Sequence, residues 1–481
     1  MGNVAETYFE QAMLALTRRE HDRVDRLLVE CLKADPKFIE AWVLRGNSLN
    51  VLGRPFDAVL NYERALQLEP NRRDALTNVG IALADLGKFE AAEEAYKRSI
   101  RVLDAVEPRM NLADLCVAMM RLEEGVEHYR RATEHEPGNH EAHLNLGVAL
   151  MGLGKWDEGF REYYWRHKGT PYPEVERTRI PLWEGQSLRG KHILLMPEQG
   201  FGDEILFMRV VQWLQHRVPQ TTYLKARSPM RLLAKYSFSS LWNYANVVIV
   251  EPGDIVPADY VCSLMDVAMW LKVQPTEEVV PVTGAIYIRW PESHPYVPKD
   301  GFRIGLCWES GQRPLQPDTK ASAANKSIPL EMFSELIKSV DHDRVRFISL
   351  QKDHRDQKLA RELGIIDFME GVNDFAGTAA IINKLDLVIS VDTAVAHLAA
   401  AMGAPTMNLV RFSGYWPWMG ATEDTIWYPG MRIYRQPKLW DWKEPLNRLQ
   451  TDVAGIVQKY VEVNRAEEYQ ATLPKIASTK H

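Results

Sequence analysis

The sequence contains few cysteines and no strong excess of either charge. Its 481 residues include four cysteines, none of which forms a Cys-x-x-Cys pair with another. This scarcity excludes a disulfide framework and gives no indication of a zinc site. The 58 basic and 64 acidic residues leave a formal charge of −6, which argues against electrostatic binding of nucleic acid. The composition predicts a reducing, cytoplasmic environment.

Long apolar runs are also missing. Nowhere does the sequence contain the run of about 18 apolar residues that suggests a membrane-spanning helix. The N-terminus has no basic segment followed by an apolar core, so no secretory signal is predicted. The chain is too long for one hydrophobic core, and its 46% hydrophobic residues are ordinary for globular domains. We therefore expect several domains.

An internal repeat is the strongest pattern that is present. Gly46 and Tyr62 of one unit recur in the next unit as Gly80 and Tyr96, after about 34 residues. This period is typical of tetratricopeptide repeats, in which each helix pair buries its apolar face against its neighbour. The sequence therefore predicts an α-solenoid over residues 5–172.

One row of polar residues marks the first helices of these repeats. Asn78, Asn111 and Asn145 occupy the same position in three successive repeats. Side-chain amides in a row can bind the backbone of an extended peptide without requiring a particular sequence. An exposed position that merely tolerates asparagine would give the same pattern. We take the three residues as candidate contacts to a protein acceptor in the repeat groove.

After residue 172 the helical period stops, and short apolar runs alternate with helical stretches. This alternation predicts an α/β structure with parallel sheets. We place a first Rossmann-like lobe at residues 173–298, a second at 299–465 and a polar tail at 466–481, with a closing helix at 448–463. Two such lobes form the GT-B architecture, and open α/β sheets bind ligands at the carboxyl ends of their strands. We therefore expect a binding cleft between the lobes.

A glycine-rich turn between a strand and a helix is the first candidate segment of this cleft. Gly200 and Gly202 permit close approach of a ligand, and Asp203 would project into the cleft. The dinucleotide-binding fingerprint is not met, because Ile205 stands where a third small residue is required. A helix-capping role for Asp203 is an alternative on local sequence.

A second candidate segment follows the apolar run that ends at Ser390. Asp392, Thr393 and Ala394 mark the start of a helix. The N–H groups and the dipole of such a helix start can receive a diphosphate. A single histidine such as His397 is more often packed in a core than involved in binding, so both roles stay open.

A third candidate segment combines Trp308 and Ser310 after a strand with Lys326 and Ser327 after a loop. A lysine in this place can neutralise a departing phosphate, although most lysines are simply solvated. Gln351, at the end of another strand, is a candidate reader of the nucleotide base.

No group of residues has a convincing metal-ligand spacing, so we expect no metal cofactor. Asp341 and Asp343 superficially match the Asp-x-Asp motif of metal-dependent sugar transferases. They lie between a predicted helix and a predicted strand, and we interpret them as a turn.

The three segments resemble motifs of the heptosyltransferase family and occur in that family's order. Val388–Pro405 resembles its Asp-[Ser/Thr]-Gly-x-x-His-Leu-Ala-Ala motif, Gln199–Asp203 its Gly-Asp turn, and Lys326–Pro329 its Lys-x-Trp-Pro. The resemblance implies that Asp203 is the base that takes the proton of the acceptor hydroxyl. It departs at Ala394, where the family has glycine, and at the tryptophan of Lys-x-Trp-Pro. These departures imply that the donor need not be ADP-heptose.

Further stretches, including Ser349–Lys352 and Trp427–Arg432, resemble bacterial repeat-bearing glycosyltransferases, among them enzymes that modify flagellin. This resemblance implies inverting, metal-independent transfer of a sugar from a nucleotide-sugar donor to a protein hydroxyl. In that reaction Lys326 and the helix start would stabilise the leaving phosphate. The asparagine row resembles the asparagine ladder of O-linked N-acetylglucosamine transferases, whose repeats carry protein substrates.

Two other functions stay open. A heptosyltransferase that acts on a lipid-linked saccharide would use the same motifs, but it would not need the repeats. A non-catalytic scaffold would not need an intact set of Asp203, Lys326 and Asp392, all of which are present.

Overall fold

The computed structural model divides the chain into two compact units, Met1–Gly169 and Thr170–His481. The structure describes residues 2–169, 179–239, 244–272, 288–289, 297–298, 300–311, 326–340, 343–352, 356–412, 414, 416–418, 420, 423–438 and 441–472. Side chains are described from residue 4 to 168 in the first unit and up to residue 463 in the second. Within these ranges, no helix is both long and apolar enough to cross a membrane.

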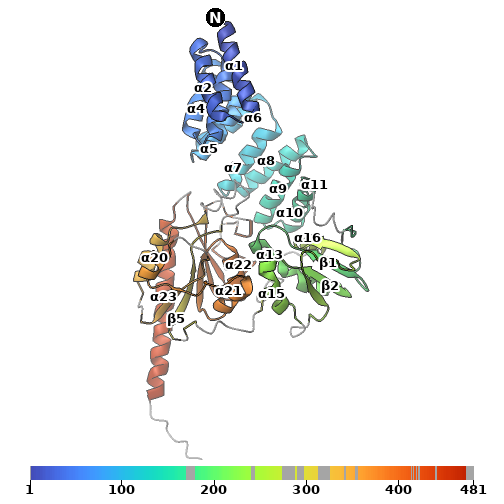
Figure 1. Ribbon diagram of the computed structural model, residues 1–481, viewed down its shortest axis with the longest axis vertical. Coiled ribbons are helices and arrows are strands. Elements are labelled where there is room, and N and C mark those ends of the chain that lie inside the picture. The colour runs from blue at the N-terminus through green and yellow to red at the C-terminus, as the bar shows by residue number, and fades with distance from the viewer. Residues whose placement is uncertain are drawn as a thin grey trace, which may run out of the picture. The chain divides into compact units, whose positions relative to one another are not determined.

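The first unit is a series of helix pairs. The first helices of the pairs are α1 (Gly2–Thr17), α3 (Ile39–Val51), α5 (Arg73–Asp85), α7 (Val106–Ala118) and α9 (His140–Gly152). Their partners are α2 (His21–Ala34), α4 (Pro55–Leu68), α6 (Phe89–Val102), α8 (Leu122–His135) and α10 (Trp156–Tyr163), followed by the short α11 (Arg166–Gly169). Each pair packs on the next (Figure 1). The predicted solenoid of tetratricopeptide repeats is therefore confirmed.

Recurrent glycines and tyrosines explain how the helices of a pair approach each other. A Cβ atom on Gly46 would lie 2.5 Å from the ring of Tyr62, and one on Gly80 would lie 2.5 Å from the ring of Tyr96. Both tyrosines are buried. The missing side chain of each glycine thus makes room for the ring of the partner helix.

The first lobe of the second unit is built on a parallel sheet in the order β3-β2-β1-β4. Its strands are β1 (His192–Met196), β2 (Thr221–Lys225), β3 (Val247–Val250) and β4 (Tyr260–Ser263). The helices α13 (Phe201–Met208), α14 (Val210–Gln215), α15 (Ser228–Ser237) and α16 (Leu264–Trp270) follow these strands in the chain. The strand β1 lies inside the sheet, between β2 and β4.

The second lobe contains a parallel sheet in the order β10-β9-β8-β5-β6-β7. Its strands are β5 (Phe302–Cys307), β6 (Val345–Ser349), β7 (Ile366–Asp367), β8 (Leu387–Val391), β9 (Thr406–Val410) and β10 (Met431–Arg435). Between them lie η2 (Leu330–Phe333), α19 (Ser334–Lys338), α20 (Gln357–Glu362), α21 (Phe375–Ile382), α22 (Ala394–Ala401) and η3 (Trp416–Trp418). Two parallel sheets with crossover helices confirm the predicted GT-B fold of two Rossmann-like lobes.

The last helix, α23 (Lys443–Thr472), packs Leu449 and Val453 into the core of the second lobe. It is longer than the predicted helix at 448–463 and continues into the segment predicted as a polar tail. Residues 473–481 of that segment lie outside the described residues.

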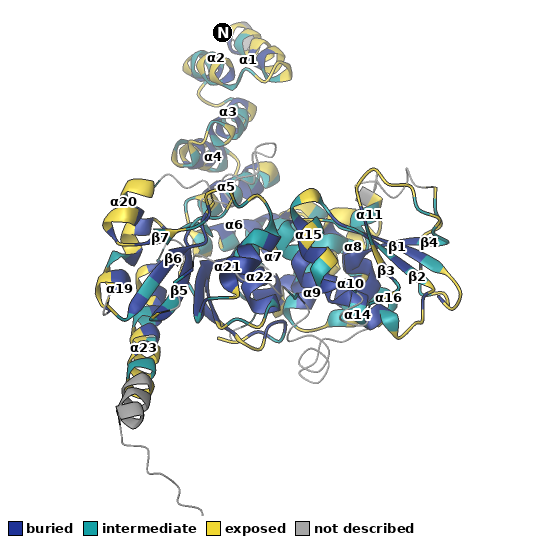
Figure 2. Cartoon of the chain, turned by 60° about the horizontal axis from the view of Figure 1, so that its bottom comes forward, coloured by how far each residue is buried: buried dark blue, intermediate teal, exposed yellow. Residues whose placement is uncertain are grey.

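The two lobes meet through helices that lie between the sheets. The helix α13 packs against α22, and α15 packs against α21 (Figure 1). Figure 2 shows α22 as one of the most deeply buried helices of the unit. The carboxyl ends of the inner strands β1, β5 and β8 therefore lead into segments close to this junction.

Candidate active site

A cavity of about 670 Å³ lies between the two lobes of the second unit. Its volume is in the range of sites that bind small molecules, about 300–1,000 Å³. It is lined by ten of the predicted residues, namely Gly200, Gly202, Asp203, Ser310, Lys326, Gln351, Asp392, Thr393, Ala394 and His397. The fold thus brings together three segments that are far apart in the sequence.

The glycine-rich turn after β1 reaches across to the second lobe. A Cβ atom on Gly202 would lie 2.8 Å from Cδ2 of His397, which is too close for two carbon atoms. Gly202 is therefore needed for the contact between α13 and α22, and a side chain at this position would displace the imidazole or separate the lobes.

Asp203 lies in the first turn of α13 and lines the cavity. Its Oδ2 accepts a hydrogen bond from the backbone N–H of Gly200 at 3.0 Å. The capping role considered for Asp203 is thus present in the structure. This hydrogen bond holds the Asp203 carboxylate at the start of α13, and the half-buried residue still lines the cavity.

Asp392, which follows β8, has two partners on its two carboxylate oxygens. Lys326 Nζ lies 2.8 Å from Oδ2, and the indole N–H of Trp418 donates to Oδ1 at 2.8 Å. The side chain of Asp392 is 5% exposed, against 21% for Lys326. Burial raises the pKa of Asp392, but the Lys326 ammonium and the hydrogen bond from Trp418 lower it by more, so the pKa of the carboxyl falls below its usual value. The carboxylate is charged and orients the lysine.

The helix α22 begins beside this ion pair with Thr393 as its N-cap residue. The Thr393 hydroxyl does not cap the helix and lies 3.1 Å from the hydroxyl of Ser390. At the start of α21, which also lines the cavity, the Asp374 side chain accepts the N–H of Gly377 at 2.9 Å. The N-cap side chain of α22 makes no such bond, which favours an anion at the N–H groups of that helix start.

His397 is buried and neutral. It is 3% exposed, and its Nδ1 lies 3.0 Å from the hydroxyl of Tyr428. Burial lowers the pKa of His397 to about 4; the Asp392 carboxylate opposes this shift, and the cations Lys326 and Arg209 add to it. An uncharged imidazole adds no positive charge to the site. Its ring packs instead against Trp418, with centroids 5.0 Å apart.

Two of the predicted donor-binding residues do not line the cavity. The Trp308 side chain is fully buried in the core of the second lobe, so it is not placed to contact a donor. The reason is that the apolar run of β5 continues through Trp308. The Ser327 hydroxyl accepts the backbone N–H of Ser310 at 3.0 Å and thereby ties the segment beside Lys326 to the loop after β5.

Gln351 lines the cavity but is engaged by the protein backbone. Its Oε1 accepts the N–H groups of Glu309 at 2.8 Å and of Trp308 at 3.2 Å. The oxygen therefore holds the turn after β5, and the contact of Gln351 to a base stays a prediction. Both donors are backbone N–H groups, which every residue except proline possesses, so no residue type in the sequence indicates these two bonds.

An aromatic pair, which sequence reasoning did not assign, completes the cavity wall. Phe201 of the first lobe and Phe375 of the second lie with ring centroids 5.2 Å apart. The Arg227 guanidinium lies 4.3 Å from the Phe201 ring centroid and pairs with the buried Glu204 at 2.6 Å. These contacts of Arg227 stabilise the glycine-rich turn after β1.

In the repeat unit, the asparagine row is not a uniform ladder. The amide of Asn78 donates to Oδ1 of Asn47 at 2.8 Å, and that of Asn145 donates to Oδ1 of Asp114 at 3.4 Å. Both acceptors belong to the preceding repeat. For Asn111 the equivalent residue is Ile81, which offers no acceptor. The Asn111 amide nitrogen is buried, and among the described residues it has no hydrogen-bond partner.

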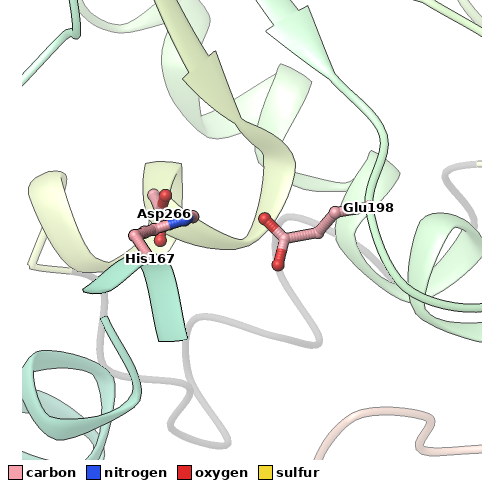
Figure 3. A group of neighbouring side chains, drawn as sticks. All are labelled: His167, Glu198 and Asp266. Atoms are coloured by element: carbon pink, nitrogen blue, oxygen red, sulfur yellow. The ribbon is translucent and has the colours of Figure 1, made fainter. Parts of the chain in front are cut away.

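Two carboxylates outside the cavity come close to each other. Glu198 follows β1, and Asp266 lies in α16 (Figure 3). One carboxylate oxygen of Glu198 lies within 4.8 Å of one carboxylate oxygen of Asp266. His167, also drawn in Figure 3, belongs to the repeat unit. Two carboxylates supply fewer ligands than a protein metal site commonly uses. Asp341 of the superficial Asp-x-Asp motif lies outside the described residues.

Comparison with protein families finds a match within each unit. Residues 314–413 match glycosyltransferase family 9 (heptosyltransferase), and residues 43–105 and 110–173 match the tetratricopeptide repeat. The first match contains Lys326 and the segment from Asp392 to His397. The chain therefore combines tetratricopeptide repeats with a heptosyltransferase-like glycosyltransferase domain, as the motifs implied.

Protein FlbA of Caulobacter vibrioides is 26% identical over 464 residues, which cover 90% of this chain and 70% of FlbA. The DnaJ homolog subfamily C member 7 homolog of Schizosaccharomyces pombe is 24% identical over 169 residues, or 32% of this chain and 36% of that protein. Among solved structures, MamA from Desulfovibrio magneticus RS-1 is 22% identical with a TM-score of 0.32. The matched region covers 37% of this chain and 98% of the MamA chain. The similarity to FlbA thus extends over most of this chain.

Proposed function

We propose that the protein transfers a sugar from a nucleotide-sugar donor to a hydroxyl of a protein acceptor, with inversion at the anomeric carbon and without a metal ion. One observation carries this proposal. A single cavity contains a carboxylate of the first lobe, Asp203, together with a cation of the second, Lys326, and the uncapped start of α22. A base and a phosphate site on two walls of one cavity are what such a transfer requires.

The second lobe would hold the phosphate of the donor. The start of α22 supplies N–H groups and a positive dipole end, and Lys326 supplies an ammonium whose three N–H groups can donate both to Asp392 and to a phosphate oxygen. Ala394 adds a methyl group where the related motif has glycine, which favours a donor other than ADP-heptose. With a CMP-linked nonulosonic acid as donor, the same groups would stabilise a monophosphate.

The first lobe would supply the base. Asp203 takes the proton of the acceptor hydroxyl while that oxygen attacks the anomeric carbon. Because Asp203 and the phosphate groups belong to different lobes, the attacking oxygen and the leaving phosphate would stand on opposite sides of the sugar. This arrangement supports inversion.

Charge neutralisation by the protein supports a metal-independent reaction. In metal-dependent transfer an ion offsets the charge that develops on the leaving phosphate. Here Lys326 and the dipole of α22 would do so.

The repeats would hold the protein acceptor. Asn78, Asn111 and Asn145 occupy the same position in three successive first helices, and amides in such a row can hydrogen-bond the backbone of an extended peptide. The resemblance to repeat-bearing enzymes that modify flagellin makes flagellin a candidate acceptor. A cytoplasmic location is part of the same proposal, because the four cysteines of the chain are free thiols, as in a reducing compartment.

Thermal unfolding in the presence of UDP-, GDP-, ADP- and CMP-sugars tests the proposed donor class. A donor at about 100 times its Kd should stabilise the protein by about 2.7 kcal/mol. The Lys326→Ala variant serves as the control and should show a much smaller shift. Stabilisation by none of these compounds would contradict the proposal. Sugar transfer to a lipid-linked saccharide, and to no protein, would favour the lipid-directed heptosyltransferase instead.

A further inference from the structure

We propose that Trp418 is a positioning residue for donor binding: its indole N–H fixes Asp392, and Asp392 in turn holds the Lys326 ammonium at the cavity. This inference rests on the proposed function, in which Lys326 binds the phosphate of the donor. It concerns a residue that lies after the segment 314–413 matched to the glycosyltransferase family.

The geometry of Asp392 links the two residues. Its Oδ1 accepts the indole N–H of Trp418 at 2.8 Å, and its Oδ2 lies 2.8 Å from Lys326 Nζ. Because each carboxylate oxygen has its own partner, rotation of the carboxylate would break one of these bonds. The bond from Trp418 therefore fixes the direction from which Asp392 meets the lysine.

Trp418 is itself held rigidly. It is 1% exposed, and its ring centroid lies 5.0 Å from that of His397 and 6.1 Å from that of Tyr428. Its backbone carbonyl accepts a hydrogen bond from the Arg435 guanidinium. The indole thus has no room to turn away from Asp392, and its N–H acts on the cavity through that carboxylate.

Charge explains why this arrangement favours a phosphate. A buried carboxylate alone beside a phosphate would repel it, but the ion pair with Lys326 removes the net charge of Asp392. An ammonium has three N–H groups, so it can donate to Asp392 and also to a phosphate oxygen. A correctly oriented Asp392 leaves the lysine directed toward the ligand.

Substitution of Trp418 by phenylalanine removes the N–H and keeps an aromatic ring. A matched control exists in the same unit, because Trp183 is also 1% exposed and donates its indole N–H to the carbonyl of Gln186 at 2.8 Å. Trp183→Phe therefore removes one indole hydrogen bond from a buried site without touching Asp392. Asp392→Asn provides a second variant, which keeps an acceptor for Trp418 but lacks the charge that holds Lys326.

The experiment measures binding of ADP, GDP, UDP and CDP, and of the matching nucleosides, by titration calorimetry. For the diphosphate that the wild type binds, Trp418→Phe should weaken binding about tenfold, which corresponds to about 1.4 kcal/mol. The matching nucleoside, which has no phosphate, should bind the variant as it binds the wild type. Trp183→Phe should leave both affinities unchanged, and Asp392→Asn should weaken diphosphate binding.

Wild-type diphosphate affinity in a folded Trp418→Phe variant would overturn the inference and leave the proposed function standing. An equal loss of nucleoside and diphosphate binding would also overturn it, because the effect would then be a general collapse of the cavity. If Trp418→Phe does not fold, undiminished diphosphate binding by Asp392→Asn overturns it. Failure of the wild type to bind any of the four diphosphates would contradict the proposed function itself, and this inference with it.

Discussion

Gly202 of the first lobe and His397 of the second lie in direct contact, and a Cβ atom on Gly202 would come within 2.8 Å of the imidazole Cδ2. The imidazole has little freedom to move, because it is 3% exposed and lies against Tyr428 and Trp418. Two motifs that are nearly 200 residues apart in the sequence thus depend on each other for their shape.

Replacement of Gly202 by alanine should therefore separate the lobes or displace the ring. Overpacking of this kind costs about 1–3 kcal/mol of stability. We expect a lower melting temperature and weaker donor binding. Gly253→Ala is the matched control, because a Cβ there meets nothing within 4 Å. Equal melting temperatures and equal donor affinities of the two variants would show that the contact affects neither stability nor donor binding.

Asp203→Asn should lose transfer activity and keep donor binding. An asparagine oxygen can still accept the N–H of Gly200, so the helix start should remain intact, while the base is gone. We expect a fall in kcat of about a hundredfold or more, with little change in the donor KM. Steady-state kinetics provide the measurement, and unaltered turnover would refute the assignment of Asp203 as the base.

Lys326→Ala should weaken donor binding and also lower stability. It removes a cation from the phosphate site and leaves the Asp392 carboxylate, which is 5% exposed, without its ion-pair partner. Breaking a buried pair from one side costs about 3–5 kcal/mol, less here because Lys326 is partly exposed. Addition of Asp392→Asn should restore the melting temperature but not donor affinity. Wild-type donor affinity in the single variant would place the phosphate elsewhere.

The stability of the second unit should fall as the pH decreases from about 6.5 to about 4. The pKa of His397 is lowered from 6.5 to about 4 by burial, so in this window the unfolded chain binds a proton that the folded chain does not. The effect amounts to at most about 1.4 kcal/mol per pH unit. Asp392, whose pKa is lowered from 3.8, loses its contribution only below that value. Urea unfolding at pH 7 and pH 5 should show a smaller decrease for His397→Gln than for the wild type.

Asn145→Ala should impair use of the protein acceptor with little loss of stability. The amide of Asn145 donates to Asp114 at 3.4 Å in an exposed position, whereas that of Asn78 donates to Asn47 at 2.8 Å in a partly buried one. One peptide contact contributes about 0.5–1.5 kcal/mol, so the acceptor KM should rise a few-fold to about tenfold. In the comparison variant Asn78→Ala, the melting temperature should fall more. An unchanged acceptor KM in Asn145→Ala would exclude this amide as an acceptor contact.

The sequence allowed prediction of the solenoid and of most of the cavity, for two physical reasons. Tetratricopeptide repeats keep a fixed period, which the recurrence of Gly46 and Tyr62 shows directly. In parallel sheets, residues that follow inner strands gather at one edge, and in a fold of two such lobes these edges border one cleft, so Asp203 of the first lobe and Asp392 of the second were expected to line it.

Other features depended on contacts that no local pattern reveals. Trp418 reaches Asp392 only because the chain after β9 folds back over α22. Gln351 is occupied by backbone N–H groups, which every residue possesses. The asparagine row is interrupted because Ile81 stands where an acceptor is required, and this matters only once the register between repeats is known.

Transfer of a radiolabelled sugar from the stabilising nucleotide sugar into an extract of the host cell, followed by separation of protein from lipid, tests whether a protein is the acceptor. With the wild-type enzyme, we expect label in the protein fraction, from which proteases should release it, and with Asp203→Asn we expect almost none. Label in the lipid fraction alone, or equal labelling of protein by the wild type and by Asp203→Asn, would contradict this expectation.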